Sequence, residues 1–132
     1  MTPIVFYAHS GLRYLVLLAG LAALVYLLYG LFSRRDFDKL ANALSGAYVG
    51  LMDLQVLLGI VLYLLVPSYP QLLGHVVMML AAVTVGHVTN IMNKRREKKS
   101  YAVAFLGVAL SLVLIIGGIM AIGRPLIGSG GL

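Results

Sequence analysis

Four long apolar stretches, almost without charged residues, constrain this chain more than any other feature. Each supplies the roughly 20 residues that a helix needs to cross a bilayer core. They predict helices over residues 3–32, 40–66, 71–93 and 101–122. Because the stretches are continuous rather than alternating, strands are disfavoured, and helices satisfy every backbone group inside lipid. We therefore predict an all-α integral membrane protein.

The breaks between the stretches are short, which predicts the order of the helices in space. Short connections make successive helices antiparallel neighbours, so we expect an up-down-up-down four-helix bundle. We see no second domain and interpret residues 1–132 as one transmembrane domain, with a loose tail, "LIGSGGL", at 126–132. The composition agrees, since 61% of the residues are hydrophobic, against about 45–50% in soluble domains.

The basic residues predict the orientation in the membrane. Eight of the ten fall in two clusters, namely Arg34, Arg35 and Lys39, and Lys94, Arg95, Arg96, Lys98 and Lys99. Positively charged loops stay on the cytoplasmic side, so both termini are expected outside. We therefore attribute the net charge of +6 to loops that flank the membrane rather than to a nucleic-acid-binding surface. The predicted partner is the lipid bilayer, and no nucleic acid is expected.

Two histidines are predicted to lie at nearly the same depth. His9 falls roughly 9 Å and His75 roughly 6 Å below the outer ends of the first and third helices. Two imidazoles on different helices of a bundle can hold a heme iron from both sides. We expect Gly11 and Gly74, next to the histidines, to let a heme ring approach the backbone. The alternative is that His9 is an interfacial histidine with no ligand role.

Arginine and aspartate inside the apolar stretches also need partners. Arg13 and Arg124 are expected near the outer side, where they would neutralise heme propionates. Asp53 falls near the middle of the second helix, and an intramembrane carboxylate usually pairs inward or marks an ion path. Arg13 is the basic residue nearest in depth, so we expect an Arg13–Asp53 pair, which would fix helix packing, relay protons or tune a ligand.

Gln55 and His87 complete a candidate polar network with Asp53. Gln55 is nearly opposite Asp53 around the helix and is expected to bond to a different neighbour. His87 has no second histidine at its level, so we expect a buried side chain bonded to Thr84 or to a carbonyl. A second bis-histidine heme is not predicted.

Four short motifs resemble a family of bacterial four-helix membrane proteins labelled cytochrome b-like. They are "HSGLR" at 9–13, "DLQVLLG" at 53–59, "GHVVM" at 74–78 and "GH" at 86–87. The family pattern is H-S-G-x-R in the first helix, H-x-Q-x-x-x-G in the second and E-H-x-x-M in the third. The resemblance spans most of the chain and implies a multi-pass protein of the bacterial cytoplasmic membrane.

Carried over by position, the resemblance matches His9 and His75, and also Gln55 and Gly59. This chain departs from the pattern twice: it has Asp53 where the family has histidine, and glycine in place of the glutamate before His75. If the family uses that second-helix histidine as a ligand, this chain lacks it.

The preferred interpretation is a membrane b-type cytochrome, in which His9 and His75 hold one heme b near the outer leaflet. It would transfer single electrons, with quinol or a partner protein as donor; whether it is an enzyme stays open. One alternative is a non-redox accessory subunit of a larger respiratory or photosynthetic membrane complex. Another is a small ion or proton transporter using Asp53 and Arg13.

Small residues on the fourth helix predict close helix contact. Gly107, Ser111 and Gly118 recur at spacings of four and seven. Small residues let membrane helices approach closely. This face would serve either the bundle itself or a second copy in a homodimer.

Overall fold

The computed structural model describes residues 2–33, 36–65, 67 and 70–122. These residues form four helices and no strand, and the all-α prediction is confirmed. The helices are α1 (Thr2–Phe32), α2 (Lys39–Leu65), α3 (Pro70–Lys94) and α4 (Tyr101–Ala121). Each helix ends within one residue of its prediction. The predicted loose tail at residues 126–132 lies outside the described residues.

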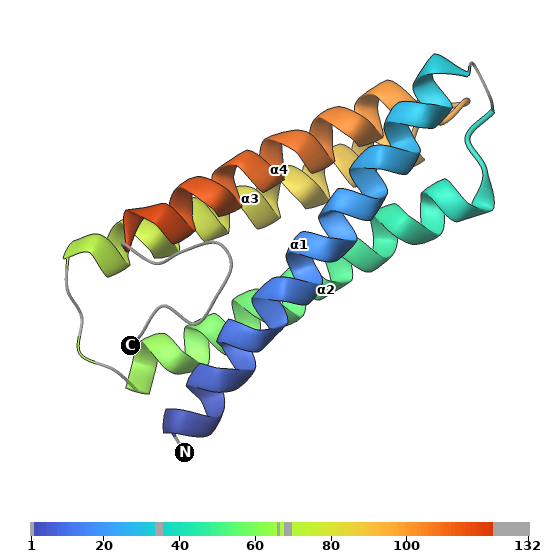
Figure 1. Ribbon diagram of the computed structural model, residues 1–132. Helices are drawn as coiled ribbons and strands as arrows, with labels where there is room; N and C mark the ends of the chain where they lie inside the picture. The colour runs from blue at the N-terminus through green and yellow to red at the C-terminus, as the bar shows by residue number, and fades with distance from the viewer. Residues whose placement is uncertain (1, 34–35, 66, 68–69, 123–132) are drawn as a thin grey trace.

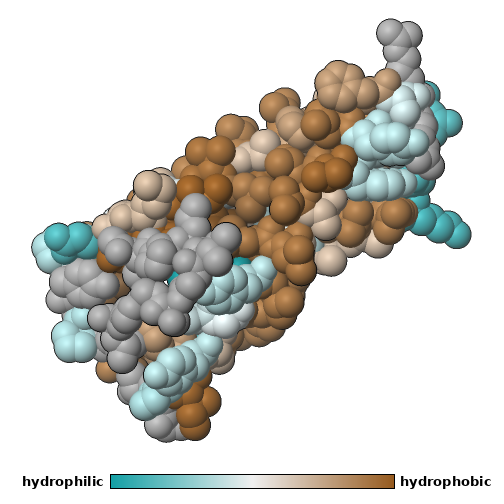
Figure 2. All heavy atoms as spheres, in the orientation of Figure 1, coloured by the Kyte–Doolittle hydropathy of each residue, from teal (hydrophilic) through white to brown (hydrophobic). Residues whose placement is uncertain are grey.

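All four helices are long and apolar enough to cross a membrane. Large apolar side chains point outward along the bundle, including Leu18, Leu64 and Val113, which are 63%, 78% and 65% exposed. A soluble bundle would carry polar residues on such faces. Figure 2 shows apolar side chains over the middle of the visible face, with hydrophilic groups toward both ends. These features are those of a multi-pass membrane protein.

The helices pair into two hairpins. One hairpin consists of α1 and α2, and the other of α3 and α4, and within each hairpin the helices pack along much of their length. The hairpins meet mainly where α1 packs on α4, and less where α2 packs on α3. Consequently α1 and α3 lie across the bundle from each other. Figure 1 shows the hairpins close together at one end and diverging at the other.

The ends of α1 and α3 and the starts of α2 and α4 lie where the hairpins converge, which we call the closed end. Here Lys98 pairs with Asp36 at 3.2 Å. The Tyr101 hydroxyl donates a hydrogen bond to the Asp36 carbonyl oxygen at 3.0 Å. These contacts join the residues that precede α2 to those that precede and begin α4.

The small residues of α4 face into the bundle. Ser111 is fully buried and lies 2.7 Å from the Tyr48 hydroxyl of α2. A Cβ added at Gly107 would lie 2.1 Å from the Thr89 hydroxyl, and one at Gly118 would lie 2.3 Å from a methionine of α3. The face formed by Gly107, Ser111 and Gly118 thus serves the packing of one chain.

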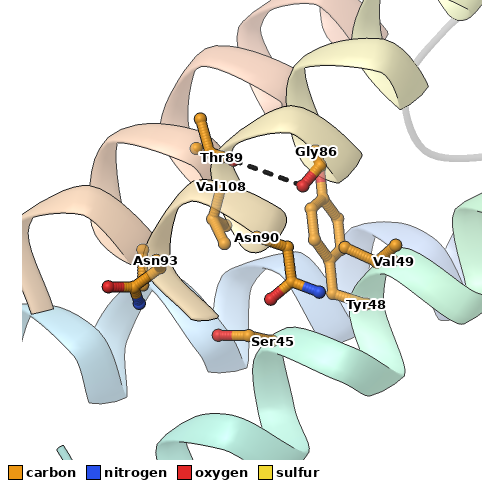
Figure 3. A pocket seen from close by; sticks show the side chains of 10 residues that line it. Ser45, Tyr48, Val49, Gly86, Thr89, Asn90, Asn93 and Val108 are labelled. Carbon is orange, nitrogen blue, oxygen red and sulfur yellow. Dashed lines mark hydrogen bonds between the residues drawn. The ribbon is translucent and has the colours of Figure 1, made fainter. Parts of the chain in front are cut away.

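A small polar pocket lies between α2, α3 and α4 in the closed half. Figure 3 shows Ser45 and Asn90 beside it, with Tyr48 and Asn93 nearby. Its volume is about 20 Å³, enough for one water molecule. The closed half of the bundle is therefore almost fully packed.

Candidate functional site: a cavity between the hairpins

A large cavity lies between the hairpins at the opposite end, which we call the open end. This end contains the start of α1, the end of α2, the start of α3 and the end of α4. The cavity volume is about 660 Å³, within the range of about 300–1,000 Å³ typical of small-molecule sites. Its lining is mostly aliphatic and aromatic. The polar side chains among the lining residues are His9, Ser10, Arg13, Gln55, Tyr63 and His75.

His9 is positioned on α1 by two residues of α2. A Cβ added at Gly59 would lie 3.0 Å from Cε1 of the His9 ring, so the imidazole packs directly on the α2 backbone. The Gln55 amide nitrogen donates a hydrogen bond to the His9 carbonyl oxygen at 2.8 Å. Gln55 and Gly59 are four residues apart and therefore share one face of α2. Together they hold both the backbone and the ring of His9.

His75 is positioned on α3 by a carbonyl group of α4. Its Nδ1 lies 2.7 Å from the Gly118 carbonyl oxygen. A carbonyl oxygen only accepts, so the hydrogen bond places a proton on Nδ1, and Nε2 carries the lone pair in the neutral ring. Histidine ligands of metals are usually oriented in this way, by donation from the other ring nitrogen. The α3–α4 hairpin therefore presents His75 in a tautomer suited to ligation through Nε2.

The two histidines that line the cavity come from different hairpins. His9 belongs to the α1–α2 hairpin and His75 to the α3–α4 hairpin, and both side chains are among the lining residues. His9 and His75, predicted to lie at similar depth, are therefore both lining residues of the same cavity.

Arg13 adds a buried cation to the same cavity. It is only 7% exposed, and its guanidinium donates a hydrogen bond to the Tyr14 hydroxyl at 2.8 Å. Arg13 lies one turn after His9, so both face the cavity from α1. The second predicted propionate partner, Arg124, lies outside the described residues.

The predicted Arg13–Asp53 pair is wrong. Asp53 instead pairs with His87, at 2.6 Å between Oδ1 and Nε2. Neither of these side chains lines the cavity. Gln55 follows Asp53 by two residues, which is about 200° around a helix. Since Gln55 faces the cavity, Asp53 faces away from it and from Arg13.

The expectations for His87 and for the polar network need correction accordingly. His87 does not bond to Thr84, whose hydroxyl donates to the Leu80 carbonyl oxygen instead. The His87 side chain is also half exposed rather than buried. Asp53 and His87 form one pair on the outside of the bundle, and Gln55 belongs to the His9 environment, as its predicted separation from Asp53 implied.

Gly11 and Gly74, which were predicted to let a heme ring approach the backbone, are not among the residues that line the cavity. A Cβ added at either would meet nothing within 4 Å. Gly59 and Gly118 instead lie against the imidazoles, each on the helix paired with that of the histidine. Gly59 belongs to the second motif and follows Gln55 by four residues. That spacing could have predicted that both residues face His9. No comparable sequence pattern links Gly118 to His75.

The described residues contain no group of three or more histidine, cysteine, aspartate or glutamate side chains able to hold a metal ion. Two histidines can bind a metal whose remaining coordination positions are filled by a cofactor. Heme iron is such a metal, since the porphyrin leaves only two axial positions to the protein.

Comparisons of this chain with family models, with curated proteins and with solved structures found no match.

Proposed function

We propose that this protein is a membrane b-type cytochrome that binds one heme b between its hairpins, with His9 and His75 as axial ligands. The observation that carries the proposal is that each hairpin contributes one imidazole to a single cavity of about 660 Å³. In this proposal the chain is an up-down-up-down bundle in the bacterial cytoplasmic membrane. The basic closed end faces the cytoplasm, and both termini face outside.

The lining residues fit the chemistry of a heme. The aliphatic walls suit the apolar macrocycle, and Arg13 offers a cation for a propionate. Donation from His75 Nδ1 to the Gly118 carbonyl orients the ring and leaves Nε2 as the nitrogen that would bind the iron. The packing of His9 on Gly59 limits how far that ring can rotate. The bound heme would supply one-electron chemistry by cycling between ferric and ferrous iron.

The position of the cavity restricts the route of electrons. It lies at the open end, whereas the hydrophobic core of a bilayer is about 30 Å thick. A single heme there serves a donor and an acceptor on the outer side. A quinol diffusing in the outer leaflet or a partner protein could supply the electron.

The other two interpretations have less support from the geometry. Arg13 faces the cavity and Asp53 faces outward, so the two do not line one path through the bundle. This arrangement does not favour the proposed transporter. An accessory subunit without a cofactor gives no reason for His9 and His75 to line one cavity. Such a subunit would be colourless when purified.

The visible absorption spectrum of the purified protein tests the proposal. We expect a Soret band, and an α band that appears on reduction with dithionite. His9→Ala and His75→Ala should each abolish the low-spin bis-histidine spectrum, because each removes one axial ligand. Circular dichroism should show unchanged helix content.

His87→Ala is the matched control, because it removes the remaining histidine without touching the cavity. It should retain the wild-type spectrum. A colourless wild-type protein from heme-replete cells, which also takes up no added hemin, would refute the proposal. A spectrum that survives both His9→Ala and His75→Ala would refute the ligand assignment.

A further inference from the structure

A serine in the closed half of the bundle is buried without a hydrogen bond from its side chain. Ser45 of α2 is only 7% exposed, and its hydroxyl oxygen forms no hydrogen bond to another described residue. The hydroxyls of Thr84 and Thr89 on α3, in contrast, each donate to a carbonyl oxygen one turn earlier, at 2.7 and 2.8 Å. A buried hydroxyl without a partner destabilises a fold. Ser45 therefore indicates a hydrogen bond that the described residues do not supply.

The Ser45 side chain lines the small polar pocket between α2, α3 and α4. The volume of this pocket is about 20 Å³, and one water molecule needs roughly 10–15 Å³. Figure 3 shows Ser45 on α2 and Asn90 on α3 beside the pocket, with their polar groups between the two helices. Because α2 and α3 belong to different hairpins, the pocket lies at the boundary between the hairpins.

Tyr48 provides a further hydrogen-bond acceptor beside the pocket. The Ser111 hydroxyl donates its proton to the Val108 carbonyl oxygen at 3.0 Å. The contact of 2.7 Å between the Tyr48 and Ser111 hydroxyls is therefore a hydrogen bond donated by Tyr48. The Tyr48 oxygen can still accept, and Tyr48 lines the pocket together with Ser45 and Asn90. Buried water molecules typically have two to four such polar partners.

We infer that the pocket binds one water molecule, which links Ser45 of α2 to Asn90 of α3. Water donates and accepts hydrogen bonds, so it can bridge a hydroxyl and an amide. A cation fits less well, because none of the lining residues is acidic and an uncompensated charge is costly inside a membrane. Hydrogen bonds between helices help to hold membrane bundles together, so this water would join the two hairpins. The inference does not depend on heme binding.

Radiolytic footprinting of the protein in detergent micelles tests directly for the water. A short X-ray pulse converts water into hydroxyl radicals, which oxidise the side chains next to the water that produced them. Tyr48 lines the pocket and is 0% exposed, so bulk solvent does not reach it. We expect mass spectrometry to detect oxidation of Tyr48 in the wild-type protein. Leu27, which is equally buried but does not line the pocket, should stay unmodified.

Ser45→Val should displace the water, because it removes the hydroxyl and places two methyl groups in the pocket. Oxidation of Tyr48 should then fall to background. Ser10→Val is the matched control, because Ser10 lines the large cavity and not this pocket. It should leave the oxidation of Tyr48 unchanged. Circular dichroism should show the same helix content in both variants.

Ser45→Ala provides an independent measurement, because it adds no bulk to the pocket. If water binds the hydroxyl, this variant should raise the equilibrium constant of unfolding roughly 2- to 10-fold. If the hydroxyl has no partner, the sign should be opposite, because the variant removes an unsatisfied buried group. Unfolding by denaturing detergent, followed by circular dichroism, measures the change. Replacing Na⁺ and K⁺ in the buffer by choline should not alter it.

Four outcomes would overturn the inference. The first is an unmodified Tyr48 in wild-type protein in which Tyr7, which is 67% exposed, is oxidised. The second is oxidation of Tyr48 that persists in Ser45→Val. The third is stabilisation by Ser45→Ala. The fourth is wild-type stability that rises to saturation with Na⁺ or K⁺ and loses this dependence in Ser45→Ala, which would assign the pocket to a cation.

Discussion

The closed and open ends are built from the same four apolar helices, yet one is packed and the other is hollow. The closed half contains a pocket of about 20 Å³, whereas the open half contains a cavity of about 660 Å³. Hydropathy does not explain this difference, because all four helices are apolar along most of their length. The difference lies in which helices the glycines bring together.

In the closed half, Gly20 and Gly30 of α1 lie against the other hairpin, while Gly107 of α4 packs on α3 within its own hairpin. A Cβ added at Gly30 of α1 would lie 2.3 Å from the Tyr101 ring of α4, and one at Gly20 would lie 2.7 Å from Leu112 of α4. At the open end, Gly59 and Gly118 join helices within the same hairpin. Lipid is as apolar as the helices, so close approach depends on small residues and hydrogen bonds rather than on hydrophobic burial. The hairpins diverge where such contacts between them end.

Truncation of a buried side chain should have the largest effect on stability, and the loss should differ between the closed and open halves. Leu27 in the closed half is fully buried, and Leu27→Ala should lower the free energy of unfolding by about 2–5 kcal/mol because it leaves a void. Leu62 lines the open cavity, so Leu62→Ala should cost clearly less. Unfolding by denaturing detergent, followed by circular dichroism, measures both. Equal losses would contradict the contrast in packing.

A side chain at Gly30 tests whether glycine holds the hairpins together. Gly30→Val would push against the Tyr101 ring and strain its hydrogen bond to Asp36. The expected loss is about 1–3 kcal/mol, as for other overpacked sites. Gly11→Val should be nearly neutral in the same unfolding assay, because nothing lies within 4 Å of that position. If the two variants are equally stable, close contact at Gly30 does not join the hairpins.

Larger side chains should change stability in opposite directions in the two halves. These are the smallest changes that we expect. Val76→Phe adds volume to the open cavity and should stabilise the heme-free protein by about 0.5–2 kcal/mol while reducing hemin uptake. Val108 lines the small pocket of the closed half and is 5% exposed, so Val108→Phe should destabilise. Thermal unfolding of both heme-free variants, with hemin titration of the first, measures these effects. Stabilisation by both would mean that the closed half also has room.

Much of the fold was predictable because it depends on single helices. Apolar length gave each helix to within one residue, and the short connections implied that both basic clusters share one end. The common depth of His9 and His75 followed from counting residues at a fixed rise. Each of these properties belongs to one helix and its ends.

The rest depended on how helices are rotated against one another. The sequence suggested Arg13 as the partner of Asp53 because the two have similar depth, but rotation of α2 turns Asp53 outward to His87. Similarly, the glycines that contact the imidazoles are on neighbouring helices rather than beside the histidines in sequence. Hydropathy is nearly uniform around these helices, so it does not specify which side of each faces inward.

The sequence by itself determined a four-helix membrane protein in which α1 and α3 each carry a histidine near the same end of the bundle. Only the tertiary structure decided that these histidines share a cavity, that Arg13 joins them and that Asp53 does not. The physical reason is that length and charge act on each helix separately, whereas a cavity forms from the contacts that helices make, or fail to make, with one another.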